Sequence, residues 1–216
     1  MKLGLVLVCA GRGKRLKQDK PVLLINGEPL FYHAYRAFKN VKSISEIAMV
    51  MRKEHIQKAA HLIDDRRVIY VRGGQFRRDS VLNGLYALSG NITHVLIHDG
   101  ARPLVTSAVV NNVIKGLKKH DAVICALKAR DTLKRVGTDM VKETIKREDI
   151  VNVQTPQGFK KDLIMKAYKR LGRKDFYDDA QLVEKLGKKV KVVEGDIKNI
   201  KITYPQDIEF AEKLMV

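Results

Sequence analysis

Apolar runs and amphipathic segments alternate through the first 128 residues of the chain. Segment 3–10 (LGLVLVCA) is apolar throughout, which is typical of a strand buried on both faces. Similar runs predict further strands at 46–51, 67–73, 93–99 and 121–128. Between them, the apolar residues fall near helical spacing in PLFYHAYRAFKNV, KEHIQKAAHLI, RRDSVLNGLYAL and SAVVNNVIKGLKKH, and Asp79 or Ser80 is the expected N-cap of the third helix. The alternation predicts an α/β domain with a mostly parallel sheet.

The rhythm breaks after residue 128. The stretch from Arg130 to Phe159 has no helical period, and VGTD (136–139) is typical of a hairpin turn between two polar strands, DTLKRV and MVKETIK. A two-stranded ribbon with so little apolar content is marginal alone, so we expect it to pack against a second subunit. Beyond it we expect helices at LIMKAYKRL and DDAQLVEKLG, short strands at KKVKVVEGD and NIKITY, and a last helix that begins near Pro205.

The composition is that of a globular protein. Of the 216 residues, 45% are apolar, which is enough for a sizeable core in a single domain, 1–216. We find no segment of transmembrane length and no signal-peptide profile, so we expect a cytoplasmic protein with no membrane partner. Cys9 and Cys125 both lie in apolar runs, and we expect two buried thiols rather than a disulfide or a zinc site.

A net charge of +18 is compatible with nucleic acid, a membrane surface or small anionic substrates as partners, or with a lysine-rich solvated surface. The chain has no aromatic-interleaved basic motif, no zinc finger and no clear helix-turn-helix, and it has no Trp. A basic nucleic-acid-binding protein is therefore a distant alternative, and we expect no nucleic-acid partner.

The turn after the first strand, AGRGKRL (10–16), combines glycines with cations. It fails the dinucleotide fingerprint because Leu16 stands at the third glycine position, and it fails the Walker A pattern because Arg15 replaces the hydroxyl residue. Glycines let backbone N–H groups approach a ligand, and open α/β sheets bind ligands beyond the carboxyl ends of their strands. The cations nearby are Arg12, Lys14, Arg15, Lys17 and Lys20. The turn therefore indicates either a polyphosphate site or a basic surface loop.

Other polar residues are expected at the same edge of the sheet. Gly73-Gly74 ends the third strand, and Asp99 ends the fourth, where a carboxylate can bind a divalent cation or cap a turn. Lys201 adds a cation near the C-terminus. Because the chain offers no Ser-His-Asp set and no Gly-x-Ser-x-Gly elbow, these residues favour phosphoryl or nucleotidyl transfer.

The chain resembles the sugar-phosphate cytidylyltransferases, most closely those that act on 2-C-methyl-D-erythritol 4-phosphate. The resemblance covers essentially the whole chain and rests, in order, on AGRGKRL, Lys20, GGQFRRDSV, HDGARP, ARDTLKR, Arg147, TPQGF, YDDAQ and NIKIT. It implies a Rossmann-like, three-layer α/β nucleotidyltransferase fold with a mostly parallel twisted sheet. A protruding β-arm at about 129–150 would pair two subunits and enter the neighbour's site. CTP, a polyol phosphate and Mg²⁺ are the implied ligands.

The resemblance also implies roles for individual residues. It implies that Arg15, Lys20 and Lys201 are catalytic and that Asp99 also lies near Mg²⁺. The implied nucleotide-binding residues are Ala10, Gly11, Arg12, Gly13, Gly74, Arg77 and Ser80. The implied residues on the side of the polyol phosphate are Asp99, Arg102, Thr132, Arg147 and Thr155.

The chain departs from the resembled family at three places. Asp19-Lys20-Pro21 stands where the family usually has Pro-Lys-Gln, Gln75 replaces an Asp after the glycine pair, and Gly100 replaces an Ala. A ribitol 5-phosphate cytidylyltransferase, which shares the fold and most motifs, is the nearest alternative. A uridylyl- or guanylyltransferase is a more distant one.

Overall fold

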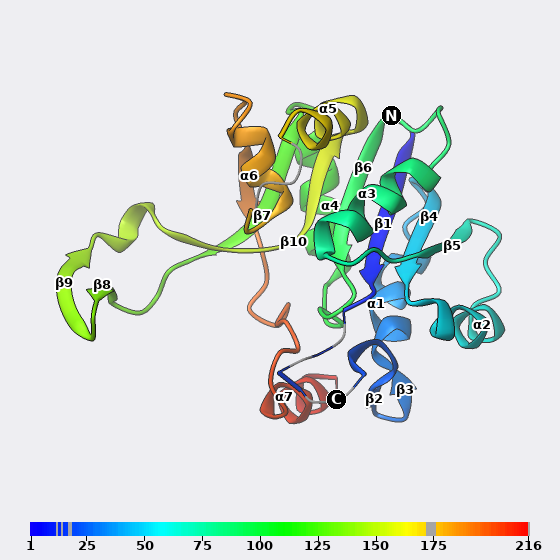
Figure 1. The fold of residues 1–216 in the computed structure, drawn as a ribbon, viewed down its shortest axis with the longest axis horizontal. Helices are drawn as coiled ribbons and strands as arrows, with labels where there is room; N and C mark the ends of the chain where they lie inside the picture. Colours follow the sequence, from blue (N-terminus) through cyan, green and yellow to red (C-terminus); the bar gives the residue numbers. More distant parts are fainter. Residues whose placement is uncertain (12, 14, 17–18, 172–175, 216) are drawn as a thin grey trace.

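A computed structural model describes residues 1–11, 13, 15–16, 19–171 and 176–215. Its centre is a seven-stranded sheet with the strand order β11-β7-β10-β6-β1-β4-β5 (Figure 1). Arg12, Lys14 and Lys17, which the sequence places in the basic turn, lie outside the described residues. The strands of the sheet are β1 (Leu3–Cys9), β4 (Ile44–Met51), β5 (Val68–Arg72), β6 (His94–Asp99), β7 (Ala122–Lys128), β10 (Val151–Lys160) and β11 (Lys191–Glu194).

Most of the sheet is parallel, as predicted. Strand β1 pairs in parallel with β4 and β6, β4 with β5, and β7 with β11. The exception is β10, which is antiparallel to both of its neighbours, β6 and β7. The sequence reading assigned no strand there, because Pro156, Gly158 and several polar residues interrupt the apolar pattern that marks the other strands.

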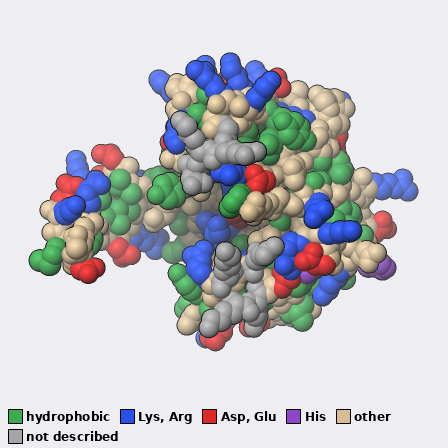
Figure 2. Space-filling model, in the orientation of Figure 1, with side chains coloured by type: hydrophobic (Ala, Val, Ile, Leu, Met, Phe, Trp, Pro, Cys, Tyr) green, Lys and Arg blue, Asp and Glu red, His purple; other side chains and the backbone are tan. Residues whose placement is uncertain are grey.

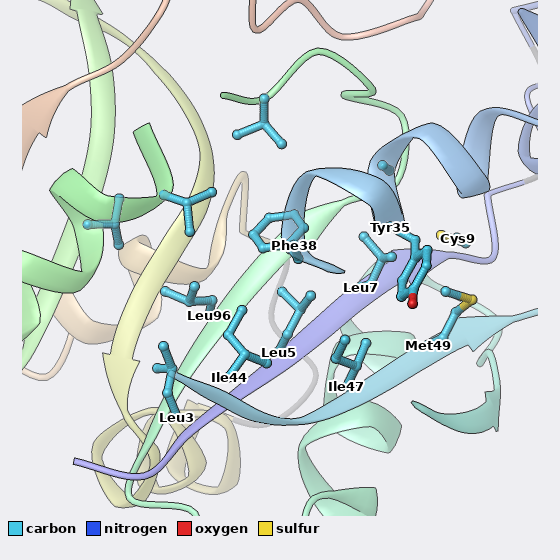
Figure 3. Close-up of a cluster of buried hydrophobic side chains, with 14 of the residues drawn as sticks. Leu3, Leu5, Leu7, Cys9, Tyr35, Phe38, Ile44, Ile47, Met49 and Leu96 are labelled. Atoms are coloured by element: carbon cyan, nitrogen blue, oxygen red, sulfur yellow. The ribbon is translucent and has the colours of Figure 1, made fainter. Parts of the chain in front are cut away.

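Helices cover both faces of the sheet, which confirms the predicted three-layer fold. Leu3, Leu5 and Leu7 of β1 join the cluster in Figure 3, against helices α1, α2 and α4. Val6 points to the other face, where α3, α5 and α6 pack, because successive side chains of a strand alternate. The helices are α1 (Leu30–Lys39), α2 (Lys53–Leu62), α3 (Arg77–Ala87), α4 (Ser107–Leu117), α5 (Lys161–Leu171) and α6 (Asp179–Glu184).

A third, smaller cluster joins the two ends of the chain. Leu16 and Ile25, after the glycine turn, pack with Ile202 and with Ala211 of α7 (Gln206–Leu214). The 3₁₀ helix η1 (Lys20–Val22) and the short strands β2 (Leu24–Ile25) and β3 (Glu28–Pro29) belong to this region. The cluster thus brings Lys20 and Lys201 to one edge of the sheet.

Two local predictions were wrong. No strand forms at 199–204, because this segment contacts the sheet edge through single hydrogen bonds, such as that from the Ile202 N–H to the Ala101 carbonyl (2.8 Å). The N-cap of α3 is Phe76 rather than Asp79 or Ser80. Asp79 lies one turn inside the helix and accepts a hydrogen bond from the Phe76 N–H (2.9 Å).

The predicted hairpin is present and projects from the body of the protein (Figure 1). Strands β8 (Leu133–Gly137) and β9 (Met140–Ile145) form a two-stranded sheet of their own, followed by the 3₁₀ helix η2 (Arg147–Asp149). Thr138 and Asp139 both have positive φ (50° and 66°), as a two-residue type I′ turn requires. Val136, Met140 and Val141 are all exposed, and Met140 is 73% accessible.

The predictions for the cysteines and for membrane spans were also tested. Cys9 and Cys125 are both buried and free, as expected. Within the described ranges, no helix combines the length and apolar character that are needed to cross a bilayer.

Candidate functional site

A cavity of about 1160 Å³ opens at the carboxyl ends of β1, β4, β5 and β6. Figure 2 shows this hollow, with Lys and Arg side chains inside it and around its mouth. Several of the predicted site residues line the cavity: Ala10, Gly11, Gly13, Lys20, Gly74, Arg77, Ser80, Asp99 and Lys201. For the residues that follow the strands, the topology explains this convergence, because parallel strands that lie side by side end at the same edge of the sheet. The small cluster that joins the two chain ends adds Lys20 and Lys201.

Asp99, at the end of β6, is the centre of an ionic network. Its Oδ1 lies 3.0 Å from Nε and 2.9 Å from Nη2 of Arg77, and its Oδ2 lies 2.7 Å from Nζ of Lys201. Arg77 also pairs with the fully buried Asp179 (2.9 Å), whose other oxygen accepts a hydrogen bond from Tyr168 (2.5 Å). Burial alone would raise the pKa of Asp99, but the charges of Arg77 and Lys201 outweigh it and lower that pKa far below its ordinary value. Asp99 is therefore ionised at neutral pH.

The same network bears on Mg²⁺. Both carboxylate oxygens of Asp99 already accept from cations, and among the described residues no group of three or more His, Cys, Asp or Glu side chains could hold a metal ion. The side chains present therefore do not fit a metal ion held by the protein. Proteins often bind Mg²⁺ through one or two carboxylates together with substrate phosphates. An Mg²⁺ ion in this cavity would have to arrive with the phosphates of a ligand.

Lys20 also lines the cavity, next to the segment that carries Lys201. Its Nζ donates a hydrogen bond to the Ile202 carbonyl (2.6 Å), which ties it to the segment that carries Lys201. Burial, together with the neighbouring charges of Lys201 and Arg15, lowers the pKa of Lys20. Arg15 does not line the cavity, and its guanidinium lies 5.5 Å from the centre of the Tyr204 ring. An anionic ligand would relieve the repulsion among these three cations.

The two glycine turns leave room for a ligand and fix the wall beside it. Gly13 has φ of +60°, a conformation that other residues rarely adopt. A Cβ on Gly74 would lie 2.2 Å from the Cβ of Asp79, so only glycine fits there. Ser80 holds this turn in place, because its hydroxyl donates to the Phe76 carbonyl (3.2 Å) and accepts from the Gly74 N–H (3.1 Å).

Thr155 and Arg102 lie outside the cavity lining and brace the site from within the protein. The Asp99 N–H donates to the Thr155 hydroxyl (3.1 Å), which donates to Nδ1 of His98 (3.0 Å), and His98 Nε2–H donates to the Arg102 carbonyl (3.1 Å). Arg102 in turn donates to the Asn199 carbonyl (2.7 Å). Burial lowers the pKa of His98 to about 4, so its ring is neutral and this chain of hydrogen bonds has a fixed direction.

Thr132 and Arg147, the two predicted residues of the arm region, do not line the cavity of their own chain. Both are exposed, and the Arg147 guanidinium donates to the Arg130 carbonyl. Within one chain, the structure therefore brings together those predicted nucleotide residues that it describes and leaves Thr132 and Arg147 apart from them.

The cavity also contains residues that the sequence reading missed. Arg52 and Lys53 follow β4, Arg72 ends β5, and Asn83 donates to the Arg72 carbonyl (3.0 Å). Phe76 lies on the same wall with half of its surface exposed. The position of Arg52-Lys53 directly after an apolar run was a usable signal, since polar residues at that place in an α/β sheet face the ligand side.

A glycine turn, a set of converging cations and a cavity beyond parallel strands define an α/β enzyme that handles nucleotide phosphates. The family model for 2-C-methyl-D-erythritol 4-phosphate cytidylyltransferase matches residues 3–216. The chain belongs to this family of nucleotidyltransferases.

Individual relatives agree over the whole length. The chain is 41% identical to the 2-C-methyl-D-erythritol 4-phosphate cytidylyltransferase of Bacillus mycoides (98% of this chain, 96% of the relative). It is 40% identical to that of Dehalococcoides mccartyi (99% and 96%). The crystal structure of 4-diphosphocytidyl-2C-methyl-D-erythritol synthase from Anaerococcus prevotii has a TM-score of 0.90 at 35% identity, covering 99% of this chain and 95% of that one. The Thermus thermophilus cytidylyltransferase gives 0.80 at 31%, covering 97% of each.

Proposed function

We propose that this protein transfers CMP from CTP to 2-C-methyl-D-erythritol 4-phosphate and releases pyrophosphate. The observation that carries the proposal is the family match over nearly the whole chain, together with the convergence of the nucleotide residues on one cavity. The product is a CDP-linked polyol, a precursor of isoprenoids made without mevalonate. The enzyme acts as one domain over residues 1–216, and we expect it in the cytoplasm.

The reaction depends on neutralising the negative charges of the two substrates more than on a general base. The nucleophile is a phosphate monoester, whose second pKa of about 6 leaves it largely dianionic near neutral pH. One of its oxygens attacks the α-phosphorus of CTP, a new O–P bond forms, and the bond to the β-phosphate oxygen breaks with departure of pyrophosphate. The protein must hold two repelling anions in line and stabilise the charge that develops on the leaving group.

We assign these tasks to the cations around the cavity. Lys20 and Lys201, with Arg15, supply fixed positive charge to the triphosphate, and backbone groups of Ala10, Gly11 and Gly13 follow its phosphates. Arg12, which lies outside the described residues, is also assigned to binding of the triphosphate. Gly74 and Ser80 are assigned to the base, and Arg77, which pairs with Asp99, lies on the same cavity wall. The substrate on this proposal is CTP in its Mg²⁺ complex, and the task of Asp99 is to orient Arg77 and Lys201.

The polyol phosphate is proposed to bind between two subunits. Thr132 and Arg147 lie apart from the cavity of their own chain, and the arm carries exposed apolar side chains that a partner could cover. We infer a homodimer in which each arm, residues 129–150, delivers Arg147 to the neighbour's cavity as a bidentate phosphate ligand. Arg102 and Thr155 then act from within the protein, by fixing the floor under Asp99.

The test is pyrophosphate release by the purified protein with CTP and Mg²⁺. Methylerythritol 4-phosphate is compared with ribitol 5-phosphate, and UTP and GTP are compared with CTP. The proposal predicts release with CTP and methylerythritol 4-phosphate only. Release with ribitol phosphate alone would retain the nucleotide site and reassign the pathway. No release with any pair would remove the proposed activity.

A further inference from the structure

The residue before Lys20 belongs to a cluster that none of the roles above includes. The Asp19 carboxylate pairs with the Arg52 guanidinium, and Asp19 Oδ2 lies 2.7 Å from Nε2 of His55. Arg52 and His55 come from the end of β4 and the first turn of α2, more than thirty residues away in sequence. Asp19 is thus tied to a different part of the sheet edge.

The three side chains are sheltered enough for this tie to matter. Asp19, Arg52 and His55 are 32%, 26% and 12% exposed. Charge-assisted hydrogen bonds between partly buried groups are stronger than ion pairs on the surface, which water and salt screen. Burial and the charge of Arg52 lower the pKa of His55. Nε2 of His55 also lies 2.9 Å from Nη2 of Arg52, so the three side chains meet at one point. A neutral His55 ring adds no second positive charge beside Arg52.

The cluster acts directly on the backbone of Lys20. Asp19 caps η1, and its carbonyl accepts from the Val22 N–H (3.2 Å), while the Lys20 carbonyl accepts from the Leu23 N–H (3.2 Å). On one side, Lys20 Nζ is held by the Ile202 carbonyl; on the other, the Asp19 carboxylate is held by Arg52 and His55. Lys20 is therefore held at its side-chain nitrogen by one part of the fold and, through the preceding residue, at its backbone by another.

We propose that Asp19 is a positioning residue, which aims Lys20 through its pairing with Arg52 and His55. The pairing accounts for the departure Asp19-Lys20-Pro21 noted in the sequence: an ionic tie before the lysine and a rigid proline after it set the course of the chain. The catalytic part of this inference rests on the proposed function. The tie itself does not, because it can be measured without turnover.

The structural test is hydrogen exchange at the Val22 and Leu23 amides. Asp19→Ala and Arg52→Ala should each speed exchange in the peptide that contains these amides, and exchange elsewhere should stay as in the wild type. Glu28→Ala is the matched control, because it breaks an ion pair of 2.6 Å with Arg36 in the same part of the chain, and Glu28 and Arg36 are absent from the cavity lining. Unchanged exchange at these amides in both Asp19→Ala and Arg52→Ala would overturn the proposal, whether or not the protein turns over CTP.

The kinetic test separates positioning from general destabilisation. Asp19→Ala should lower kcat about ten- to a hundredfold, since a misplacement of about 1 Å can cost that much. The KM for CTP should change less than threefold, and Asp19→Glu should recover part of kcat. The double variant Asp19→Ala/Arg52→Ala should be no worse than the poorer single variant, because both changes remove one interaction. Additive losses, or a loss matched by slower refolding and faster exchange throughout, would contradict a positioning role. An inactive wild type would instead remove the proposed function. The exchange result would then still show whether the pairing of Asp19 with Arg52 and His55 holds the backbone after Lys20.

Discussion

The edge of the sheet and the arm differ in how far contacts within one chain stabilise them. At the sheet edge, Asp99, Arg77 and Lys201 are brought together by three separate parts of the chain and satisfy one another's charges. In the arm, β8 and β9 contact each other across a two-residue turn, and Val136 and Met140 are exposed. The contacts of a single chain hold the first region in place, whereas a ribbon of two strands is only marginally stable by itself.

The contrast indicates how the work of the site is divided. A triphosphate needs fixed cations and backbone N–H groups, which the edge of a rigid parallel sheet supplies within one chain. The proposed ligand of the second substrate, Arg147, lies in η2 on the projecting region. If the division is real, changes at the edge should abolish chemistry in one subunit, and changes in the arm should be complemented by another.

The largest effect is expected from Lys20→Ala. Loss of a preorganised positive group near the reacting phosphates should lower turnover by about 10²- to 10³-fold, in the range seen when one stabilising group is removed from an active site. Steady-state pyrophosphate release measures the loss, and the thermal midpoint checks that the fold persists. Lys118→Ala, which removes an exposed lysine after α4, is the control and should leave turnover unchanged. Turnover near the wild-type level would remove Lys20 from the mechanism.

The next effect tests whether Arg147 acts in the neighbouring subunit. Lys20→Ala and Arg147→Ala should each be nearly inactive alone. Mixed in equal amounts and allowed to exchange subunits, they should recover about a quarter of the wild-type activity, because half of the dimers are mixed and each mixed dimer has one intact site. Exchange is confirmed by native mass spectrometry of differently tagged chains. Mixed dimers with no activity would show that the site is complete within one chain.

A smaller effect concerns the floor of the cavity. His98 has a folded-state pKa of about 4, and an unfolded histidine titrates near pH 6.5. Below pH 6.5 the unfolded state gains a proton that the folded state does not, so this group makes stability fall with pH down to about 4, by at most about 1.4 kcal/mol per pH unit. His98→Gln should flatten the dependence of the urea midpoint on pH in this window, and His61→Gln, an exposed histidine on α2, should not. Equal slopes in wild type and His98→Gln would contradict the buried neutral ring.

The sequence predicts this fold where the burial of an element can be recognised from its own run of residues. A strand such as Leu3–Cys9 is apolar on both faces, and its glycine turn follows directly, so pattern and position agree. Strand β10 was missed because its place between β6 and β7 comes from tertiary pairing, and its own residues include Pro156 and Gly158. At 199–204 the opposite error occurred: the alternating pattern predicted a strand that does not form. Such a pattern forms a strand only where a neighbouring strand is available for pairing.

The candidate site shows the same limit. The residues themselves pointed to Lys20, Asp99 and Lys201, and the resemblance gave them roles. Asp99 reaches the site as the end of a parallel strand, and the small cluster that joins the two chain ends brings Lys20 and Lys201 beside it. It did not supply the partners that fix them: the pairing of Asp19 with Arg52 joins residues with no local pattern in common. The hydroxyl of Thr155 is engaged by His98 and Asp99, and no spacing in the sequence points to that arrangement.

The division between edge and arm is tested most directly by a variant that alters the arm alone. Met140→Asp/Val141→Asp places a charge at two exposed apolar positions of β9, one on each face of the ribbon, and should give a monomer in analytical ultracentrifugation. For this variant we predict CTP affinity within about threefold of the wild type by calorimetry, together with a loss of turnover of more than about tenfold, since one orienting contact to the second substrate is removed. A monomer that turns over normally, or one that no longer binds CTP, would contradict the account.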